Sequence, residues 1–323
     1  MERKRMKPTP AITRAPRRRL GRRRIRLRVI FALILLLAAA CIGISGFVGW
    51  QLSHPDPKPL EDSPKRLGMA YEDVQFQSRQ GDLLLKGWYM PPAQTVESAT
   101  YGKAQIIMAH GYNNNREQKN AEALSLAKDL TDRGFGVLMF DFRNSGESEG
   151  TMTSVGYYEK YDLLGAIDWI KAQRPSKIGV LGFSMGASTA LTAAAEEPAV
   201  AGIVADSPFN RLSSYLNDNL SVWSHLPDFP FTPLIMNMLP PMLGIEPDEV
   251  DGLRAVDAIY PRPVLFIHSA NDPSIPLRNS ESLWEKHKDR FELWTTAAEG
   301  HARNYPPQKQ EYADRVSAFF EQL

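Results

Sequence analysis

The stretch Gly182-Phe183-Ser184-Met185-Gly186 decides how the fold is interpreted. It follows an apolar run, residues 177–181, that is typical of a short buried strand, and it leads into the small-residue, helix-compatible run 187–195. A strand that turns sharply into a helix at Ser184 strains the backbone, and the flanking glycines remove Cβ atoms that would clash across the turn. The turn exposes the hydroxyl and points the helix N-terminus at any anion formed there. We therefore interpret Ser184 as a nucleophile; an ordinary tight turn is the alternative.

Such a serine needs a base and a group that orients the base, and both follow along the chain. The apolar run 263–268 precedes a turn-rich loop that contains Asp272, and residues 291–296 alternate like a strand and lead to His301. The order Ser184, Asp272, His301 is one of the orders in which serine triads occur. We expect His301 to take the Ser184 proton and Asp272 to hold the imidazole in the right tautomer.

Each of these two assignments has an alternative. Asp272 could cap its own loop, and His301 could be a solvated surface residue. Asp206 is a second candidate for the orienting acid, because it follows the apolar run 200–205 at a predicted strand end. We favour Asp272, which follows the later strand in a loop stiffened by two prolines. Asp206 is expected to anchor the segment that comes after it.

An acyl-transfer site also needs hydrogen-bond donors for the oxyanion. The apolar run 104–109 ends in His110-Gly111-Tyr112, where a glycine lets the backbone bend so that the next amide faces the nucleophile. We assign the oxyanion hole to the backbone N–H groups of Tyr112 and Met185. His110 and His268 each lie at a strand end, and we interpret both as loop-orienting residues rather than as bases.

From about residue 70 to residue 323 the chain resembles the α/β-hydrolase-fold serine hydrolases, in particular bacterial membrane-anchored, esterase-like members. The segments that carry the resemblance are residues 110–112, 141–143 and 182–186. The resemblance implies a mostly parallel sheet with helices on both faces. Residues 141–148 are similar to the family's Asp-x-Arg-Gly-x-Gly-x-Ser loop, which braces the site. Asn144 stands at the usual glycine, a departure expected to reshape that loop without affecting the triad.

The first fifty residues have a different character. Residues 1–28 contain 13 of the chain's 38 Lys and Arg residues and one acidic residue, whereas residues 29–50 contain no charge. As a helix, these 22 residues would extend about 33 Å, enough to cross a bilayer core. The charge asymmetry predicts a basic cytoplasmic tail at 1–28, a transmembrane anchor at 29–50 and a catalytic domain outside the cell membrane.

Three other interpretations of this region are open. A cleaved signal peptide also begins with basic residues, although its apolar core usually spans only about 7–15 residues. The alanines before Cys41 weakly suggest a lipoprotein cleavage site. The arginines could form a nucleic-acid-binding arm, but their position directly before the apolar span favours a topology signal.

The rest of the chain is acidic. Beyond residue 28 it holds 25 basic and 36 acidic residues, a formal balance of −11. We therefore expect no nucleic-acid partner. The single cysteine, Cys41, lies in the apolar span, so the domain cannot form an internal disulfide. The six histidines lack metal-ligand spacing and no phosphate loop is present, so neither a cofactor nor a metal is predicted. The oligomeric state stays open.

The domain organisation follows from composition and periodicity. Residues 51–69 are rich in proline and predict a semi-rigid linker, and residues 70–323 suit one α/β-hydrolase domain. Two leading runs around Gly81 predict an antiparallel pair, after which strands and helices alternate. Asn115 and Gln118 predict a helix start nearby. Residues 207–261 lack strand patterns but are apolar, which predicts a small helical cap over the site; alternatively, its aromatic residues only pack it onto the core.

Taken together, these features predict a membrane-anchored serine hydrolase that cleaves a carboxylic ester through an acyl-enzyme. The expected substrate is a small-molecule or lipid-like acyl compound, with an amide or thioester as the alternative bond. Acyl transfer to an acceptor other than water is an alternative on the same triad. A non-catalytic binding or sensor module on the same scaffold is another. Neither the substrate nor its acyl chain length follows from fold and triad.

Overall fold

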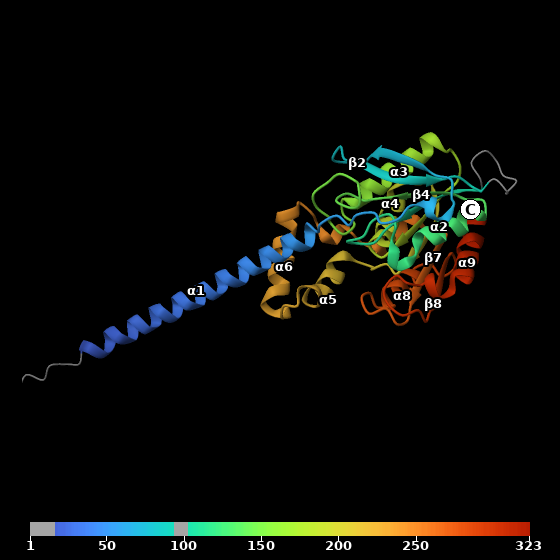
Figure 1. Cartoon of the computed structure of the whole chain (residues 1–323). Coiled ribbons are helices and arrows are strands. Elements are labelled where there is room, and N and C mark those ends of the chain that lie inside the picture. The colour runs from blue at the N-terminus through green and yellow to red at the C-terminus, as the bar shows by residue number, and fades with distance from the viewer. Residues whose placement is uncertain (1–16, 94–102) are drawn as a thin grey trace, which may run out of the picture.

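An eight-stranded sheet forms the centre of the molecule, as Figure 1 shows for the computed structural model, which describes residues 17–93 and 103–323. The strand order is β1-β2-β4-β3-β5-β6-β7-β8. The strands are β1 (Glu72–Gln77), β2 (Leu84–Met90), β3 (Gln105–Ala109), β4 (Gly136–Phe140), β5 (Ile178–Phe183), β6 (Val200–Asp206), β7 (Val264–Ser269) and β8 (Phe291–Thr296). Strand β2 is antiparallel to β1 and β4, and all other neighbours are parallel. The predicted mostly parallel sheet and leading antiparallel pair are confirmed.

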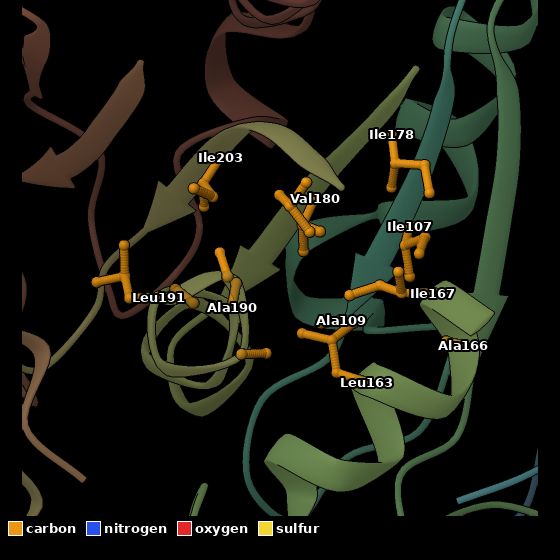
Figure 2. Close-up of a cluster of buried hydrophobic side chains, with 14 of the residues drawn as sticks. Ile107, Ala109, Leu163, Ala166, Ile167, Ile178, Val180, Ala190, Leu191 and Ile203 are labelled. Carbon is orange, nitrogen blue, oxygen red and sulfur yellow. The ribbon is translucent and has the colours of Figure 1, made fainter. Parts of the chain in front are cut away.

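Helices cover both faces of this sheet. They are α2 (Ala123–Asp132), α3 (Glu159–Gln173), α4 (Met185–Glu196), α7 (Gly252–Ile259), α8 (Arg278–Trp284) and α9 (Lys309–Glu321), with short 3-10 helices η1 (Pro64–Leu67), η2 (Lys119–Ala121) and η4 (Pro306–Gln308). Helices α3, α4 and α7 pack on one face and α2 and α9 on the other. Figure 2 shows Ile107, Val180 and Ile203 of the sheet beside side chains of α3 and α4. Because both faces are covered, the central strands are buried throughout and are apolar in sequence.

The predicted helical cap lies between β6 and β7. It contains α5 (Leu212–Ser224), α6 (Asp228–Leu243) and the 3-10 helix η3 (Pro247–Glu249). These elements have an apolar cluster of their own, which includes Leu216, Leu220, Ile235 and Leu239. Helix α7, which follows, packs instead against α4 and the sheet.

Helix α1 (Arg17–Ser53) is continuous and contains the whole predicted span. Its part Arg23–Ser53 is long and apolar enough to cross a membrane, a test that a signal sequence near the N-terminus would also pass. Residues 1–16 of the predicted basic tail lie outside the described residues.

The C-terminal end of α1 packs against α6, beside which it lies in Figure 1. Small residues one turn apart, Ser45, Gly49 and Ser53, are the buried residues of this end. A Cβ atom on Gly49 would lie 3.6 Å from Cδ2 of Leu239. Small side chains therefore allow the two helix backbones to approach closely.

The segment after α1 is bound to the domain rather than free of it. Residues 54–63 contain no helix or strand. The Asn144 side chain donates a hydrogen bond to the carbonyl of Pro55 (3.0 Å), and Glu117 accepts one from the amide of Asp62 (2.8 Å). The region predicted as a linker thus runs along the domain surface, held by polar side chains of distant loops.

The predicted helix start near Arg116 is wrong, because α2 begins only at Ala123. The side chain of Asn115 accepts a hydrogen bond from the Glu117 amide (3.0 Å) in a turn. The backbone and guanidinium of Arg116 both donate to Asp141, at 2.6 and 2.9 Å. The hydrogen bonds to the buried Asp141 carboxylate therefore hold Arg116 in a turn, where a helix was predicted to begin.

Candidate active site

Ser184 occupies the sharp turn between β5 and α4. Its φ of 54° and ψ of −117° are unusual for a residue with a side chain, and the cost must be offset by the surrounding structure. The Ser184 amide donates a hydrogen bond to the carbonyl of Asp206 (2.8 Å), which fixes the turn against the end of β6. Its side chain faces a cavity and is only slightly exposed.

The glycines on either side are required by close backbone approaches. A Cβ atom on Gly186 would lie 2.2 Å from the carbonyl oxygen of Ala109, and one on Gly182 would lie 2.4 Å from the carbonyl oxygen of Gly186. Both distances are far below van der Waals contact with rigid backbone atoms. The pattern seen in the sequence therefore has the expected steric cause.

The structure brings Ser184, His301 and Asp272 together at the carboxyl ends of β5, β8 and β7. Nε2 of His301 lies 2.6 Å from Oγ of Ser184, and Nδ1 lies 2.7 Å from Oδ2 of Asp272. The other Asp272 oxygen accepts hydrogen bonds from the amides of Ser274 (2.8 Å) and Ile275 (2.9 Å). Burial opposes the charge on Asp272, but the bonds from His301 and the two amides outweigh burial and lower its pKa. An ionised carboxylate thus holds the imidazole against the serine.

Asp206, the other candidate acid, has different partners. It accepts hydrogen bonds from the side chains of Asn304 (2.7 Å), Ser207 (2.9 Å) and Tyr312 (2.9 Å). Its side chain is fully buried, and this burial raises its pKa to about 6. The carboxylate therefore ties β6 to α9 and to the loop after β8, rather than anchoring only the segment that follows it.

Tyr112 and Met185, whose amides are the predicted oxyanion donors, lie beside the cavity that Ser184 faces. All three residues line that cavity, and a Cβ atom on Gly111 would lie 3.4 Å from Cβ of Ser184. Within the part of the chain that the structure describes, neither amide donates to another group, and Met185 opens α4, where N–H groups lack helical partners. The Gly111 amide, in contrast, is taken by Oε1 of Gln118 (2.7 Å). Two free donors therefore lie beside the serine.

His110 and His268 are both engaged in hydrogen bonds that orient loops. Nε2 of His110 accepts from the Phe142 amide (3.0 Å), so Nδ1–H donates to the carbonyl of Gly111 (2.8 Å). The His268 ring bonds the carbonyl of Ile275 (2.8 Å), in the loop after β7. Burial lowers the pKa of both residues and keeps them neutral.

The loop after β4 is held in place by hydrogen bonds to neighbouring loops. Buried Asp141 accepts hydrogen bonds from Arg116 and from the amide of Glu147 (2.9 Å). Asn144, which replaces the family's usual glycine, has a φ of 52°, a left-handed conformation that asparagine tolerates. Its side chain reaches the carbonyl of Pro55. The departure from the family pattern thus gives the loop a contact with the segment after α1.

A mainly apolar cavity lies beside Ser184. Its walls come from the sheet loops, the cap and the end of α1, and none of the lining residues is charged. The lining residues other than Ser184 are Leu52, Ser53, Tyr112, Thr153, Ser154, Val155, Met185, Leu212, Tyr215, Leu216, Leu220, Trp223, Leu239, Leu243 and Ile245. Leu52 and Ser53, in the region predicted as a linker, end α1 and line this cavity. The stripe of small residues on α1 indicates a helix contact but not its partner.

Comparisons with known proteins agree with this architecture. Residues 81–233 match the family model for X-Pro dipeptidyl-peptidase (S15 family). The uncharacterized protein YqkD of Bacillus subtilis (strain 168) is 32% identical over 243 residues, which cover 74% of this chain and 76% of YqkD. The uncharacterized protein YfhR of Escherichia coli (strain K12) is 27% identical over 266 residues, or 79% of this chain and 81% of YfhR.

A solved structure is similar over most of the chain. The esterase Pf2001 of Pyrococcus furiosus is 27% identical, with a TM-score of 0.67, over 83% of this chain and 98% of the esterase. The mostly parallel sheet and the strained turn at Ser184 are typical of the fold to which these relatives belong. The chain belongs to the family of YqkD, within the α/β-hydrolase-fold serine hydrolases.

Proposed function

We propose that the chain is a membrane-anchored serine hydrolase that cleaves a carboxylic ester through an acyl-enzyme on Ser184. The observation that carries this proposal is the pair of His301 distances, 2.6 Å to Ser184 and 2.7 Å to Asp272. Both are within the range in which a base can take a proton and be oriented by a third group. The esterase Pf2001, similar over most of the chain, supports the same reaction class.

In the first half-reaction, Oγ of Ser184 attacks the ester carbonyl carbon while Nε2 of His301 takes the hydroxyl proton. The amides of Tyr112 and Met185 stabilise the resulting oxyanion. The bond between the carbonyl carbon and the alcohol oxygen then breaks, and His301 returns its proton to that oxygen. Asp272 stays ionised and stabilises the imidazolium.

In the second half-reaction, water takes the place of the alcohol. His301 accepts a proton from water as the oxygen attacks the acyl carbon, and the bond to Ser184 breaks. The proton returns to Oγ of Ser184, and a carboxylic acid leaves. The cycle needs no oxidant, reductant or cofactor.

The uncharged cavity favours an ester over the peptides, cleaved near a free amino terminus, that the name of the matching family model suggests. A peptide amino terminus is positively charged, and burying a charge without a partner is costly. The walls beside Ser184 offer no carboxylate to receive it.

Turnover of p-nitrophenyl butyrate by the full-length protein in detergent tests the proposal. Loss of a triad member costs several orders of magnitude, so Ser184→Ala should lower kcat by at least about a thousandfold. Ser125→Ala, on α2 away from the cavity, is the matched control and should keep wild-type turnover. A folded Ser184→Ala protein with near-normal turnover would refute the mechanism.

The membrane part of the proposal has α1 as an uncleaved anchor with its basic end in the cytoplasm. The charge asymmetry supports the orientation. The packing of Gly49 against α6 supports retention, because cleavage of α1 would uncover the cap. Protease added to spheroplasts should digest the domain and spare the basic end, and the protein should resist a high-salt wash. Recovery of a soluble form that starts after about residue 40 would establish a cleaved signal instead.

A further inference from the structure

The last residues of the anchor helix are part of the cavity beside Ser184. Leu52 and Ser53 line it, and direct hydrogen bonds hold them in place. The Tyr112 hydroxyl donates to the carbonyl of Leu52 (2.6 Å), and the Thr153 amide donates to the carbonyl of Ser53 (2.8 Å). The residue whose amide is proposed to bind the oxyanion therefore also contacts the anchor.

The opposite wall of the cavity is built by the cap, which packs against the same helix. Leu239 of α6 lines the cavity and also approaches Gly49 of α1. Val48 and Leu52 pack into the apolar cluster of the cap. The cavity thus lies where α1, α6 and the loops of the sheet meet.

This side of the molecule is suited to a membrane surface. The cap carries exposed apolar side chains, with Val222 63%, Phe229 83% and Met242 38% exposed. In Figure 1, α6 lies beside α1 on the side from which α1 leaves the domain. Trp50 is exposed and stacks on His54 near the end of α1, and tryptophan is enriched at membrane interfaces. If α1 crosses the bilayer, the cavity lies close to the lipid surface, because the end of α1 lines it.

A polar hollow lies on the other side of Tyr112, which lines both spaces. Its other lining residues are Lys58, Pro59, Glu61, Asn113, Asn114, Asn115, Lys119 and Asn120. Lys119 is paired with Glu61 and approaches Glu117 at 3.6 Å. The hollow therefore offers asparagine amide groups, the ion pair of Lys119 with Glu61, and the additional cation Lys58. The amide groups, which both donate and accept hydrogen bonds, suit the hydroxyl groups of a polar alcohol.

We infer that the substrate is an amphiphilic membrane ester whose long acyl chain enters the cavity from the bilayer, between α1 and the cap. Its polar alcohol is directed toward the asparagine-lined hollow. The inference rests on the proposed function. The acyl group passes from the alcohol to Ser184 and then to water, in the two half-reactions of the proposed function. The alcohol leaves to the aqueous side, and water supplies the hydroxyl of the fatty acid. Leu52 is then a specificity-determining residue contributed by the membrane anchor.

Two esters of glycerol that differ only in chain length test this inference. Full-length protein in phosphatidylcholine vesicles is given monopalmitoylglycerol or monobutyrylglycerol, and the ratio of the two kcat/KM values is measured. Leu52→Trp fills the cavity from the α1 side. Each methylene of the palmitoyl chain that can then no longer be buried lowers the ratio about fourfold. We expect the ratio to fall at least tenfold. Ile44→Trp, on the exposed side of α1 and outside both the cavity lining and the apolar cluster of the cap, is the control and should keep the wild-type ratio.

Labelling of Ser184 by a fluorophosphonate shows whether each variant still assembles its site. If Leu52→Trp does not label, Leu52→Ala, which removes wall contacts with the chain, should lower the ratio in the same direction. A ratio that is unchanged by both Leu52 variants, or lowered equally by Ile44→Trp, overturns the inference. Ser184-dependent cleavage of monobutyrylglycerol without cleavage of monopalmitoylglycerol overturns it while leaving the proposed function intact. No Ser184-dependent cleavage of either ester overturns both.

Discussion

The two walls of the cavity differ in how they are built. On the sheet side, hydrogen bonds hold the polar side chains of the site, as in the contacts of Asp272 with His301 and two loop amides. On the other side, α1 and the cap meet through apolar side chains and small residues such as Gly49. The first wall holds groups suited to a reaction, and the second has the shape and polarity that select a substrate. Changes on the two sides should therefore have different signatures.

The largest effect is expected on the sheet side, for Asp272→Asn. Without the carboxylate, the His301 ring can adopt the tautomer that cannot accept the Ser184 proton, and kcat should fall about ten-thousandfold if the serine-protease precedent holds. The matched control is Asp206→Asn, which changes another buried carboxylate that binds Asn304 and Tyr312 instead. It should alter stability far more than turnover. A collapse of kcat confined to Asp206→Asn would reverse the assignment.

The free energy of unfolding should depend on the protonation of Asp206. Burial raises its folded pKa from an ordinary 3.8 to about 6. The folded state thus binds this proton more tightly, so the contribution is complete below about pH 4 and is lost as pH rises through 6. A shift of about two pKa units corresponds to roughly 3 kcal/mol.

Urea unfolding of the wild type and Asp206→Asn at pH 4 and pH 7 measures this contribution. Relative to the variant, the wild type should lose about 3 kcal/mol between the two pH values. Other groups titrate in both proteins and cancel in the difference. Parallel pH profiles would show that the carboxylate does not titrate in this window.

On the α1 side, a side chain added at Gly49 should loosen the cap. Its Cβ atom would lie 3.6 Å from Leu239 and 4.0 Å from Met242, so Gly49→Leu overpacks the α1–α6 contact at a cost of about 1–3 kcal/mol. Amides of α6 should then exchange hydrogen about tenfold faster. Gly43→Leu places the same side chain on the same helix where nothing lies within 4 Å, and should leave the exchange unchanged. Equal exchange in both variants would mean that the contact does not hold the cap.

The smallest effect is expected where the two walls meet, at Tyr112. Burial raises the pKa of its hydroxyl to about 12, so the group stays protonated and donates to the carbonyl of Leu52. Tyr112→Phe keeps the backbone amide and removes one hydrogen bond, worth about 0.5–1.5 kcal/mol or a two- to tenfold loss in kcat/KM. Steady-state kinetics with a long-chain ester measures it. A loss above a hundredfold would indicate that the hydroxyl acts in the reaction itself.

The two walls of the cavity also differ in how well they can be predicted from the sequence. The elbow at Ser184 and the strand ends are local patterns, and steric contacts at Gly182 and Gly186 explain why the elbow pattern is specific. The buried strands appear as apolar runs because helices cover both sheet faces. These features need only a few adjacent residues.

Features that depend on partners far along the chain were not predictable. The place of Leu52 in the cavity depends on α6, which lies almost two hundred residues later. Arg116 does not start a helix because Asp141 binds it, and Asn144 departs from the family pattern where it contacts Pro55. A single sequence carries the side chains for these contacts but does not indicate which of them meet.

The acyl-enzyme on Ser184 is tested most directly by locating a covalent adduct. Full-length protein is treated with a fluorophosphonate, digested and examined by mass spectrometry. One adduct per chain is predicted, on the peptide that contains Ser184, and none on Ser184→Ala protein. A stoichiometric adduct on another residue, or rapid ester turnover by a protein that forms no adduct at Ser184, would contradict the mechanism.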